Sequence, residues 1–403
     1  MNRTLALLSA SLIVIACADP TGPGTRRVEA PRLSVQATPQ QLFDTYVALG
    51  TSNSQGVTSA GINAAGQRTA WPAQLAARVG VDFSLPLIQD PGCSPPLLAP
   101  LATNMVLIAG FAAFGEDLVS AVMNTCMPLV TGITPPTNNV AISGAKARDA
   151  LHTTPELESA HNPRAGELYR RVLGPGQTQV TAMLAQRPTF VSVELAANEV
   201  LPVTTGRISA MTPYAEWVSD YDQIIEAVRS TGAGAVLVGL PNNAASFPSI
   251  RRAREFFNEW PDLLALGISM SFNCYFSSNY VFVPGYVLTL ISRSPTTATC
   301  KDVPGQVDYV LTSSDVNAIN ARMAQMNAHI EAKANENGYA FFKLGALYDL
   351  PKGSLNLYDV LFSKNPFGPN ISLDGVHPSA QGQTILANAA VQAINARYGV
   401  AIP

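Results

Sequence analysis

An aspartate and a histidine, Asp374 and His377, lie three residues apart in the sequence LDGVHP near the C-terminus. Across a turn the two side chains can face each other, so that the carboxylate accepts one ring N–H, fixes the tautomer and leaves the other ring nitrogen free as a base. Such a base can take the proton of a serine hydroxyl. The chain has four histidines, and the other three have no comparable setting: His152, His161 and His329.

The serine that this base would activate is Ser52. It follows the apolar run 46–49 and stands two residues after Gly50, ahead of small polar residues. A glycine allows a sharp turn at the end of a strand, so Ser52 can project its hydroxyl past the edge of the sheet. Taken alone, a turn of Gly, Ser and Asn is ordinary. Three later stretches of the sequence favour the interpretation of Ser52 as a nucleophile.

Two other apolar runs also end in small residues. The run 140–143 is followed by Gly144, and the run 189–195 is followed by two alanines and Asn198. Because ligands bind beyond the carboxyl ends of the strands in an open α/β sheet, Ser52, Gly144 and Asn198 should share one rim. A serine with a backbone N–H and an amide donor beside it is equipped to attack a carbonyl carbon and to hold the oxyanion.

Almost continuously apolar runs predict the strands that carry these residues: 45–49, 140–143, 189–195, 235–240 and 339–344. Such runs suit strands buried on both faces of a parallel sheet. They alternate with helical patterns over 214–230, from about 314 to 337, and 379–398, with Thr212 expected as an N-cap and Pro213 as the first helical residue. This alternation predicts a doubly wound α/β domain with a parallel sheet of about five strands.

Two long stretches interrupt the alternation, from about 84 to 138 and from about 244 to 312. The second contains the run 281–288, in which Pro284-Gly285 suggests the turn of a hairpin. Loops of this length usually cover a site, although their apolar residues can instead thicken the core.

In its motifs the chain resembles the SGNH (GDSL) hydrolases, from about Phe43 to Val400. The matches to the family's four sequence blocks are the GDS block at 50–52, the second-block glycine Gly144, the GxND block at 196–199 and the DxxH block at 374–377. The resemblance implies a flavodoxin-like SGNH fold with two long insertions. The GxSxG motif of the α/β-hydrolases does not occur in the sequence.

The resemblance also implies a role for each matched residue. Ser52 would be the nucleophile, His377 the base and Asp374 its orienter, while the Ser52 N–H, Gly144 and Asn198 would form the oxyanion hole. The chain departs from the family at four positions, which bear on how tightly the turns at Ser52 and at Asn198 are held. Thr51 replaces the family's Asp and Asn53 its usual Leu, while Ala196 replaces its Gly and Glu199 its Asp.

The cysteines predict disulfides. Cys93, Cys126, Cys274 and Cys300 are an even number, and of their three possible pairings Cys93–Cys126 and Cys274–Cys300 each fall within one of the long insertions. No CxxC motif or Cys/His ligand spacing occurs, so we expect no metal and no cofactor.

The fifth cysteine, Cys17, follows a short apolar segment that is too short to cross a bilayer. Residues 14–17 resemble a bacterial lipobox, which implies a signal peptide over 1–16 and a lipid on Cys17; a plain secretory signal is the alternative. A Pro- and Gly-rich tether would occupy 17–40 and the hydrolase domain 41–403. The resemblance places the protein in the bacterial cell envelope, as an outer-membrane lipoprotein facing the periplasm or the exterior.

Charge argues against nucleic acid as a partner, because the net charge is −3 and charged residues make up 13% of the chain. The one dense basic run, Arg251, Arg252 and Arg254, is bordered by Glu255 and is expected to be a solvated face. The expected partners are a small-molecule or lipid ester and, through the anchor, a membrane.

Three functions remain open. The first is an esterase or lipase working through an acyl-enzyme, which the apolar residues 96–114 and 281–291 favour as an acyl pocket or lid. The second is an acetyl esterase acting on acetylated carbohydrate. The third is a non-catalytic lipid-binding envelope lipoprotein with the same fold.

Overall fold

The computed structural model describes residues 38–93, 97, 99–103, 126–161 and 163–403. Its centre is a four-stranded parallel sheet with the spatial order β1 (Tyr46–Gly50), β2 (Phe190–Glu194), β3 (Gly234–Gly239) and β9 (Ala340–Lys343). Every residue of β1, β2 and β3 is buried, as expected of strands covered on both faces. The predicted α/β fold with a parallel sheet is confirmed.

The expected fifth strand, 140–143, is an irregular segment that runs along the free edge of β1. The Val140 N–H donates to the Ala48 carbonyl at 2.9 Å, and the Ile142 N–H donates to the Gly50 carbonyl at 3.1 Å. The segment therefore ends level with the carboxyl end of β1, and this brings Gly144 to the same rim as Ser52.

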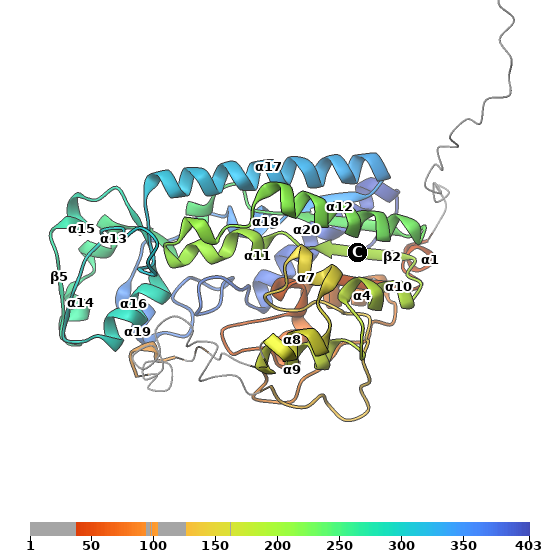
Figure 1. Ribbon diagram of the computed structural model, residues 1–403, viewed down its shortest axis with the longest axis horizontal. Helices are drawn as coiled ribbons and strands as arrows, with labels where there is room; N and C mark the ends of the chain where they lie inside the picture. Colours follow the sequence, from red (N-terminus) through yellow and green to blue (C-terminus); the bar gives the residue numbers. More distant parts are fainter. Residues whose placement is uncertain (1–37, 94–96, 98, 104–125, 162) are drawn as a thin grey trace, which may run out of the picture.

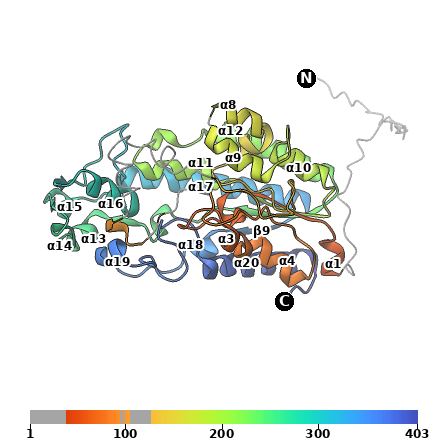
Figure 2. The ribbon, with the colours of Figure 1, turned by 90° about the horizontal axis from the view of Figure 1, so that it is seen from below.

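Alternate strand residues point to opposite faces of the sheet, and each face is covered by helices (Figures 1 and 2). Phe190 and Val236 belong to one core cluster, whereas Val191 and Ala235 belong to the other. The first face is covered by α1 (Pro39–Leu42), α3 (Ala64–Thr69), α4 (Trp71–Val79) and α20 (Ala380–Tyr398). The second is covered by α7 (Ala147–His152), α9 (Pro163–Val172), α10 (Gln179–Ala185), α12 (Tyr214–Ser230) and α17 (Ser313–Asn337), with α8 (Pro155–His161) packed on α9.

Of the three helices expected from the sequence, α17 and α20 begin and end close to the predicted residues. Helix α17 begins after Thr312, whose hydroxyl accepts from the Asp315 N–H, and ends at the left-handed Gly338; α20 is capped by Ser379. The expected cap of α12 is wrong. Pro213 is extended and is itself the N-cap, so the helix begins one residue later, and the Thr212 hydroxyl instead accepts from the Lys146 ammonium at 3.0 Å.

The second insertion forms a compact extension at one end of the molecule, drawn at the left of Figure 1. It holds an antiparallel sheet of β4 (Ile250–Arg252), β6 (Tyr280–Phe282) and β8 (Val310–Leu311), and a parallel pair of β5 (Ile268–Met270) and β7 (Thr296–Ala298). Its helices are α13 (Ala253–Asn258), α14 (Pro261–Leu264), α15 (Asn273–Phe276) and α16 (Val283–Ser292). A helix from later in the chain, α19 (Leu357–Phe362), packs against them.

The hairpin expected at Pro284-Gly285 is wrong, because both residues lie in the first turn of α16. Proline is well suited to that turn, where its missing N–H would have no partner in any case. Residues 283–288 are all buried, so this part of the insertion thickens the core. A short apolar run bounded by Pro and Gly has no periodicity that separates a buried strand from a buried helix.

Both predicted disulfides, Cys93–Cys126 and Cys274–Cys300, are present. Cys17, the proposed anchor, lies outside the described residues, as do 104–114 of the first apolar stretch. Among the helices of the described ranges, none has the length and apolar character to cross a membrane.

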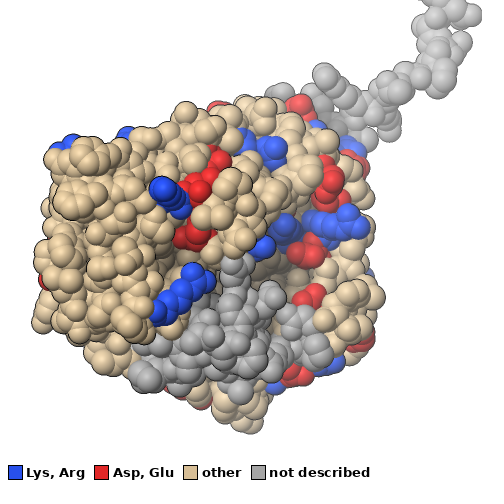
Figure 3. Space-filling view, turned by 60° about the vertical axis from the view of Figure 1, so that its left-hand side comes forward, with Lys and Arg blue, Asp and Glu red and all other residues tan. Residues whose placement is uncertain are grey.

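The basic run at 251–254 is a solvated face at Arg252 and Arg254, which are exposed, but not at Arg251. Arg251 is buried, and its guanidinium donates to the Pro248 carbonyl at 2.7 Å and to the Gly353 carbonyl at 2.6 Å. It therefore serves as an internal brace. On the face seen in Figure 3, described Lys and Arg side chains are interspersed with Asp and Glu over a largely uncharged surface.

Candidate active site

Ser52 lies where the chain turns from β1 into a short helix, α2 (Ser52–Gln55), which ends at Gly56 in the left-handed region with φ of 83°. The turn is tight, since a Cβ on Gly50 would lie 2.6 Å from the Ser54 hydroxyl oxygen. Only glycine fits at position 50. Ser52 is thereby carried past the end of the strand, as the sequence predicted for a serine at this point.

Asp374 and His377 are paired, with 2.8 Å between His377 Nδ1 and Asp374 Oδ2. The other carboxylate oxygen, Oδ1, accepts from the N–H groups of Val376 and His377 at 2.9 and 2.8 Å and from the Ser372 hydroxyl at 3.1 Å. Burial alone would raise the pKa of Asp374, but the His377 charge and these hydrogen bonds hold that pKa below its ordinary value. Asp374 is therefore ionised at neutral pH, and the pairing directs the ring N–H to Nδ1 and leaves Nε2 free.

Three contacts fasten this loop and the helix that follows it, α20, to the Ser52 turn and the segment just after that turn. The Tyr348 hydroxyl donates to the Val376 carbonyl at 2.6 Å and reaches Asn53 Oδ1 at 3.4 Å. Gln383 Nε2 donates to the Asn53 carbonyl at 3.0 Å. The Ser59 N–H donates to the Ser372 hydroxyl at 3.1 Å.

Within the described residues no hydrogen bond joins the Ser52 hydroxyl to the His377 ring. Ser52 and Val376, the neighbour of His377, nonetheless line the same pocket. Catalytic hydrogen bonds are often long in unliganded enzymes and tighten when substrate binds.

Gly144 and Asn198 lie on two neighbouring segments beside the Ser52 turn. Gly144 has φ of +82°, which other residues adopt only with strain, and a Cβ there would have no atom within 4 Å. Space next to the Gly144 backbone is therefore open to a ligand. Asn198 lies in α11 (Ala197–Val200), and its Nδ2 donates to the Ala145 carbonyl at 2.9 Å. The N–H groups of Ser52 and Gly144 have no acceptor in the described part of the chain.

The turn after β2, which carries Asn198, tolerates two of the positions at which the chain departs from the family. Ala196 has φ of −147°, so a side chain fits where the family has glycine. The Glu199 carboxylate accepts from the Ala147 N–H at 2.8 Å and so joins the Asn198 turn to the Gly144 loop. Burial raises the pKa of Glu199.

Sequence reasoning missed Glu194, a buried carboxylate directly beside the Ser52 turn. Its signal was present, because Glu194 is the one charged residue of a largely apolar run. Tyr348 and Gln383 carried no such signal, since each comes from a distant part of the sequence.

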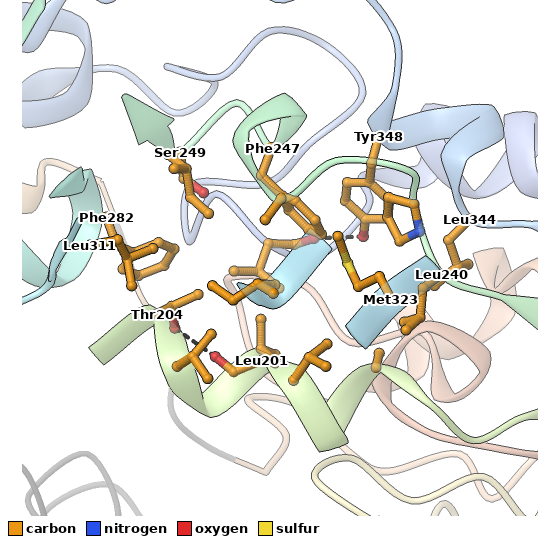
Figure 4. Close-up of a pocket in the computed structure, with 18 of the residues that line it drawn as sticks. Leu201, Thr204, Leu240, Phe247, Ser249, Phe282, Leu311, Met323, Leu344 and Tyr348 are labelled. Carbon is orange, nitrogen blue, oxygen red and sulfur yellow. Dashed lines mark hydrogen bonds between the residues drawn. The ribbon is translucent and has the colours of Figure 1, made fainter. Parts of the chain in front are cut away.

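An apolar pocket opens beside Ser52 (Figure 4). It lies between the short helix η3 (Leu201–Thr205), the loop after β3, the small sheet of the second insertion, α17 and α18 (Gly345–Tyr348). Most of its lining side chains are apolar: Val200, Leu201, Val203, Leu240, Phe247, Ile250, Phe282, Leu311, Ile319, Met323 and Leu344. Of the stretch 281–291 that was expected to build it, only Phe282 contributes.

The expectation that the other histidines lack a comparable setting is wrong for His329. Its Nε2 lies 2.7 Å from Asp222 Oδ1, across from α17 to α12. Among the residues that the structure describes, no group of three or more His, Cys, Asp or Glu side chains is placed to hold a metal ion.

The family model described as GDSL-like Lipase/Acylhydrolase matches residues 46–390, a span that includes both β1 and the His377 loop. The chain belongs to this family. It is therefore an ester-hydrolysing enzyme, and in this hydrolase Ser52 and Gly144 lie at one rim of the sheet.

Solved structures of similar proteins include an extracellular lipase from Streptomyces rimosus, with 14% identity, coverage of 87% of this chain and 98% of that chain, and a TM-score of 0.34. A phospholipase A1 from Streptomyces albidoflavus has 15% identity, the same coverages and a TM-score of 0.35. An acetylxylan esterase from Geobacillus stearothermophilus has 15% identity, coverage of 64% and 71%, and a TM-score of 0.29. Among curated protein sequences, none matches the hydrolase significantly.

Proposed function

We propose that the hydrolase is a serine esterase or lipase that cleaves carboxylic esters with apolar acyl groups through an acyl-enzyme on Ser52. His377 is the general base, and Asp374 holds its ring and stabilises the imidazolium. The Ser52 N–H, the Gly144 N–H and the Asn198 amide receive the oxyanion. The position of the apolar pocket next to Ser52 is the observation that supports this substrate class.

The reaction proceeds in two halves. Ser52 Oγ attacks the ester carbonyl while His377 Nε2 takes its proton, and the same proton is then given to the departing alcohol. In the second half, His377 Nε2 takes a proton from water as the water oxygen attacks the acyl carbon. The same proton is then given to Ser52 Oγ as the Oγ–acyl bond breaks, and the carboxylic acid is released. The oxyanion donors hold the charge in both halves.

Acetylated carbohydrate is the less favoured substrate. An acetyl group has no chain that would fill a pocket lined by Leu201, Leu240 and Met323, and this lining offers few polar groups to a sugar. A chain-length series decides between the two. We expect p-nitrophenyl esters of medium chain length to exceed both the acetate and acetylated xylan in kcat/KM.

A pocket variant and a probe sharpen the test. Leu201→Trp should shift the preference towards short esters by narrowing the pocket, and a fluorophosphonate should label the wild type but not Ser52→Ala. Acetylated xylan as the best substrate would replace the acyl-ester proposal. A folded wild type that neither turns over any ester nor reacts with the probe would favour a lipid-binding protein without catalysis.

We propose further that Cys17 carries a lipid and anchors the hydrolase in the outer membrane of a bacterial envelope. The support is the lipobox-like sequence at 14–17. A metabolic fatty-acid label should mark the wild type and not Cys17→Ser, and fractionation should find only the wild type in the outer membrane. Equal labelling of both proteins would exclude this anchor.

A further inference from the structure

Glu194 ends β2 with its side chain almost fully buried, at 1% exposure. In the register of the sheet it lies opposite Gly50, the last residue of β1. It is thus the nearest residue on the neighbouring strand to the point where the chain turns towards Ser52.

The Glu194 carboxylate collects four donors from that turn. Its Oε2 accepts from the N–H groups of Thr51 and Ser54 at 3.1 and 3.3 Å and from the Ser54 hydroxyl at 3.1 Å. The Thr51 hydroxyl lies 2.9 Å from Oε1 and 3.0 Å from Oε2. Thr51 and Ser54 stand on either side of Ser52, so the turn is held at both ends by one side chain from another strand.

An acceptor is required at this place. Backbone N–H groups can only donate, and leaving two of them unpaired in a buried turn is destabilising. A carboxylate or a carboxamide can serve, whereas an apolar side chain cannot. Burial raises the pKa of Glu194, and the hydrogen bonds from Thr51 and Ser54 act in the opposite direction.

A network that merely stabilised the sheet would look different. Two residues earlier on the same strand and face, the Ser192 hydroxyl bonds the Tyr46 hydroxyl at 2.9 Å and joins strand to strand. The Glu194 side chain makes no bond of that kind in the described residues, where all of its hydrogen bonds go to the turn.

We propose that Glu194 is a positioning residue that fixes the Ser52 turn so that the hydroxyl and the N–H of Ser52 lie where attack and oxyanion binding require them. This inference rests on the proposed role of Ser52. It predicts that loss of the carboxylate changes the rate of reaction at Ser52 more than it changes substrate binding, since most of the pocket lining comes from elements other than this turn.

The test compares Glu194→Ala, Glu194→Gln and Ser192→Ala in the full chain. Because a shift of the nucleophile by about 1 Å can lower a rate about 10²-fold, we expect Glu194→Ala to lose about that factor in kcat and in the fluorophosphonate labelling rate. Its KM should stay within about threefold of wild type if only orientation is lost. Glu194→Gln keeps an acceptor for both N–H groups and should recover most of the rate.

Ser192→Ala is the matched control, because it removes a buried hydrogen bond from the same strand without touching the turn. It should lower the melting temperature and leave kcat unchanged. If Glu194→Ala does not fold, Thr51→Val/Ser54→Ala removes the two hydroxyl donors and should lose about tenfold in kcat with KM unchanged.

The inference is overturned if a folded Glu194→Ala, or the double variant in its place, keeps wild-type kcat and labelling rate, or if Ser192→Ala loses as much rate. It is also overturned if Glu194→Gln is as slow as Glu194→Ala. A wild type that fails to react with probe and esters would instead refute the proposed function, and the two failures are therefore distinguishable.

Discussion

The described part of the hydrolase contains two histidine–carboxylate pairs of nearly equal length. His377 Nδ1 lies 2.8 Å from Asp374, and His329 Nε2 lies 2.7 Å from Asp222. The two rings are also similarly buried, with 19% and 17% of their side chains exposed. Distance and burial alone would not tell which pair belongs to a catalytic site.

The carboxylates differ in how they are held. Asp374 is fixed by two backbone N–H groups and a serine hydroxyl within its own loop, so its orientation is set before any ligand binds. Asp222 sits on a helix with 38% of its side chain exposed and shares its charge with the Lys333 ammonium at 3.3 Å. The first carboxylate can orient a ring, whereas the second joins two helices.

The surroundings differ as well. The His377 loop is tied to a turn in which the Ser52 N–H has no acceptor in the described chain and Ser52 lines a pocket. His329 packs edge-on against Trp217, with ring centroids 5.5 Å apart, in a helical layer. Backbone N–H groups inside helices are already paired, and so they cannot receive a developing negative charge. A histidine–carboxylate pair marks a site only when free donors and a nucleophile accompany it.

The largest difference in kcat should appear between variants that each remove one of the two histidine rings. His377→Ala removes the base and should lower kcat by about 10⁴-fold or more, while Ser52→Ala combined with it should be hardly worse, because the residues act as a unit. His329→Ala should keep kcat and lose about 1 kcal/mol of unfolding free energy. Steady-state kinetics on one ester, with urea denaturation of each variant, measures both.

Equal losses of kcat in folded His377→Ala and His329→Ala would show that the comparison assigns the pairs wrongly.

A smaller difference in kcat should appear between variants that each replace one of the two carboxylates by an amide. Asp374→Asn favours the wrong ring tautomer and should lower kcat about 10³- to 10⁴-fold with the fold intact. Asp222→Asn should leave kcat unchanged, since its histidine takes no part in the reaction. Near-wild-type kcat for Asp374→Asn would mean that the backbone around His377, and not Asp374, orients the ring.

The smallest effect concerns stability in acid. Because the folded-state pKa of Asp374 lies below its ordinary value of 3.8, its ionised form stabilises the fold. That stability is present above about pH 4 and is lost as the pH falls through the lowered folded-state pKa. Unfolding free energies measured by denaturant between pH 5 and pH 2 should therefore fall less steeply for Asp374→Asn than for wild type.

Asp222→Asn is the control for the acid measurement, because it leaves Asp374 in place and should retain that part of the slope. An Asp374→Asn protein with the full wild-type slope would contradict the assignment of this stabilisation to Asp374.

The sequence by itself determined the sheet and the order of the motif residues along the chain. The apolar runs around residues 47, 191, 237 and 342 became the parallel strands, because side chains buried on both faces leave few other structures open to them. The helical patterns that end before Gly338 and at Tyr398 became α17 and α20, since the apolar spacing of a helix is a local property of the chain. The two disulfides followed from cysteines close in sequence.

Only the tertiary structure decided the contacts between distant segments. Glu194 meets the turn at Thr51 from 143 residues away, and His329 meets Asp222 from 107 residues away. No local pattern encodes such pairs, because their partners depend on how strands and helices pack. The same holds for α16, whose apolar run fits a buried strand as well as a buried helix until its neighbours are known. Local chemistry sets the elements, and the free energy of packing sets which side chains meet at the Ser52 turn.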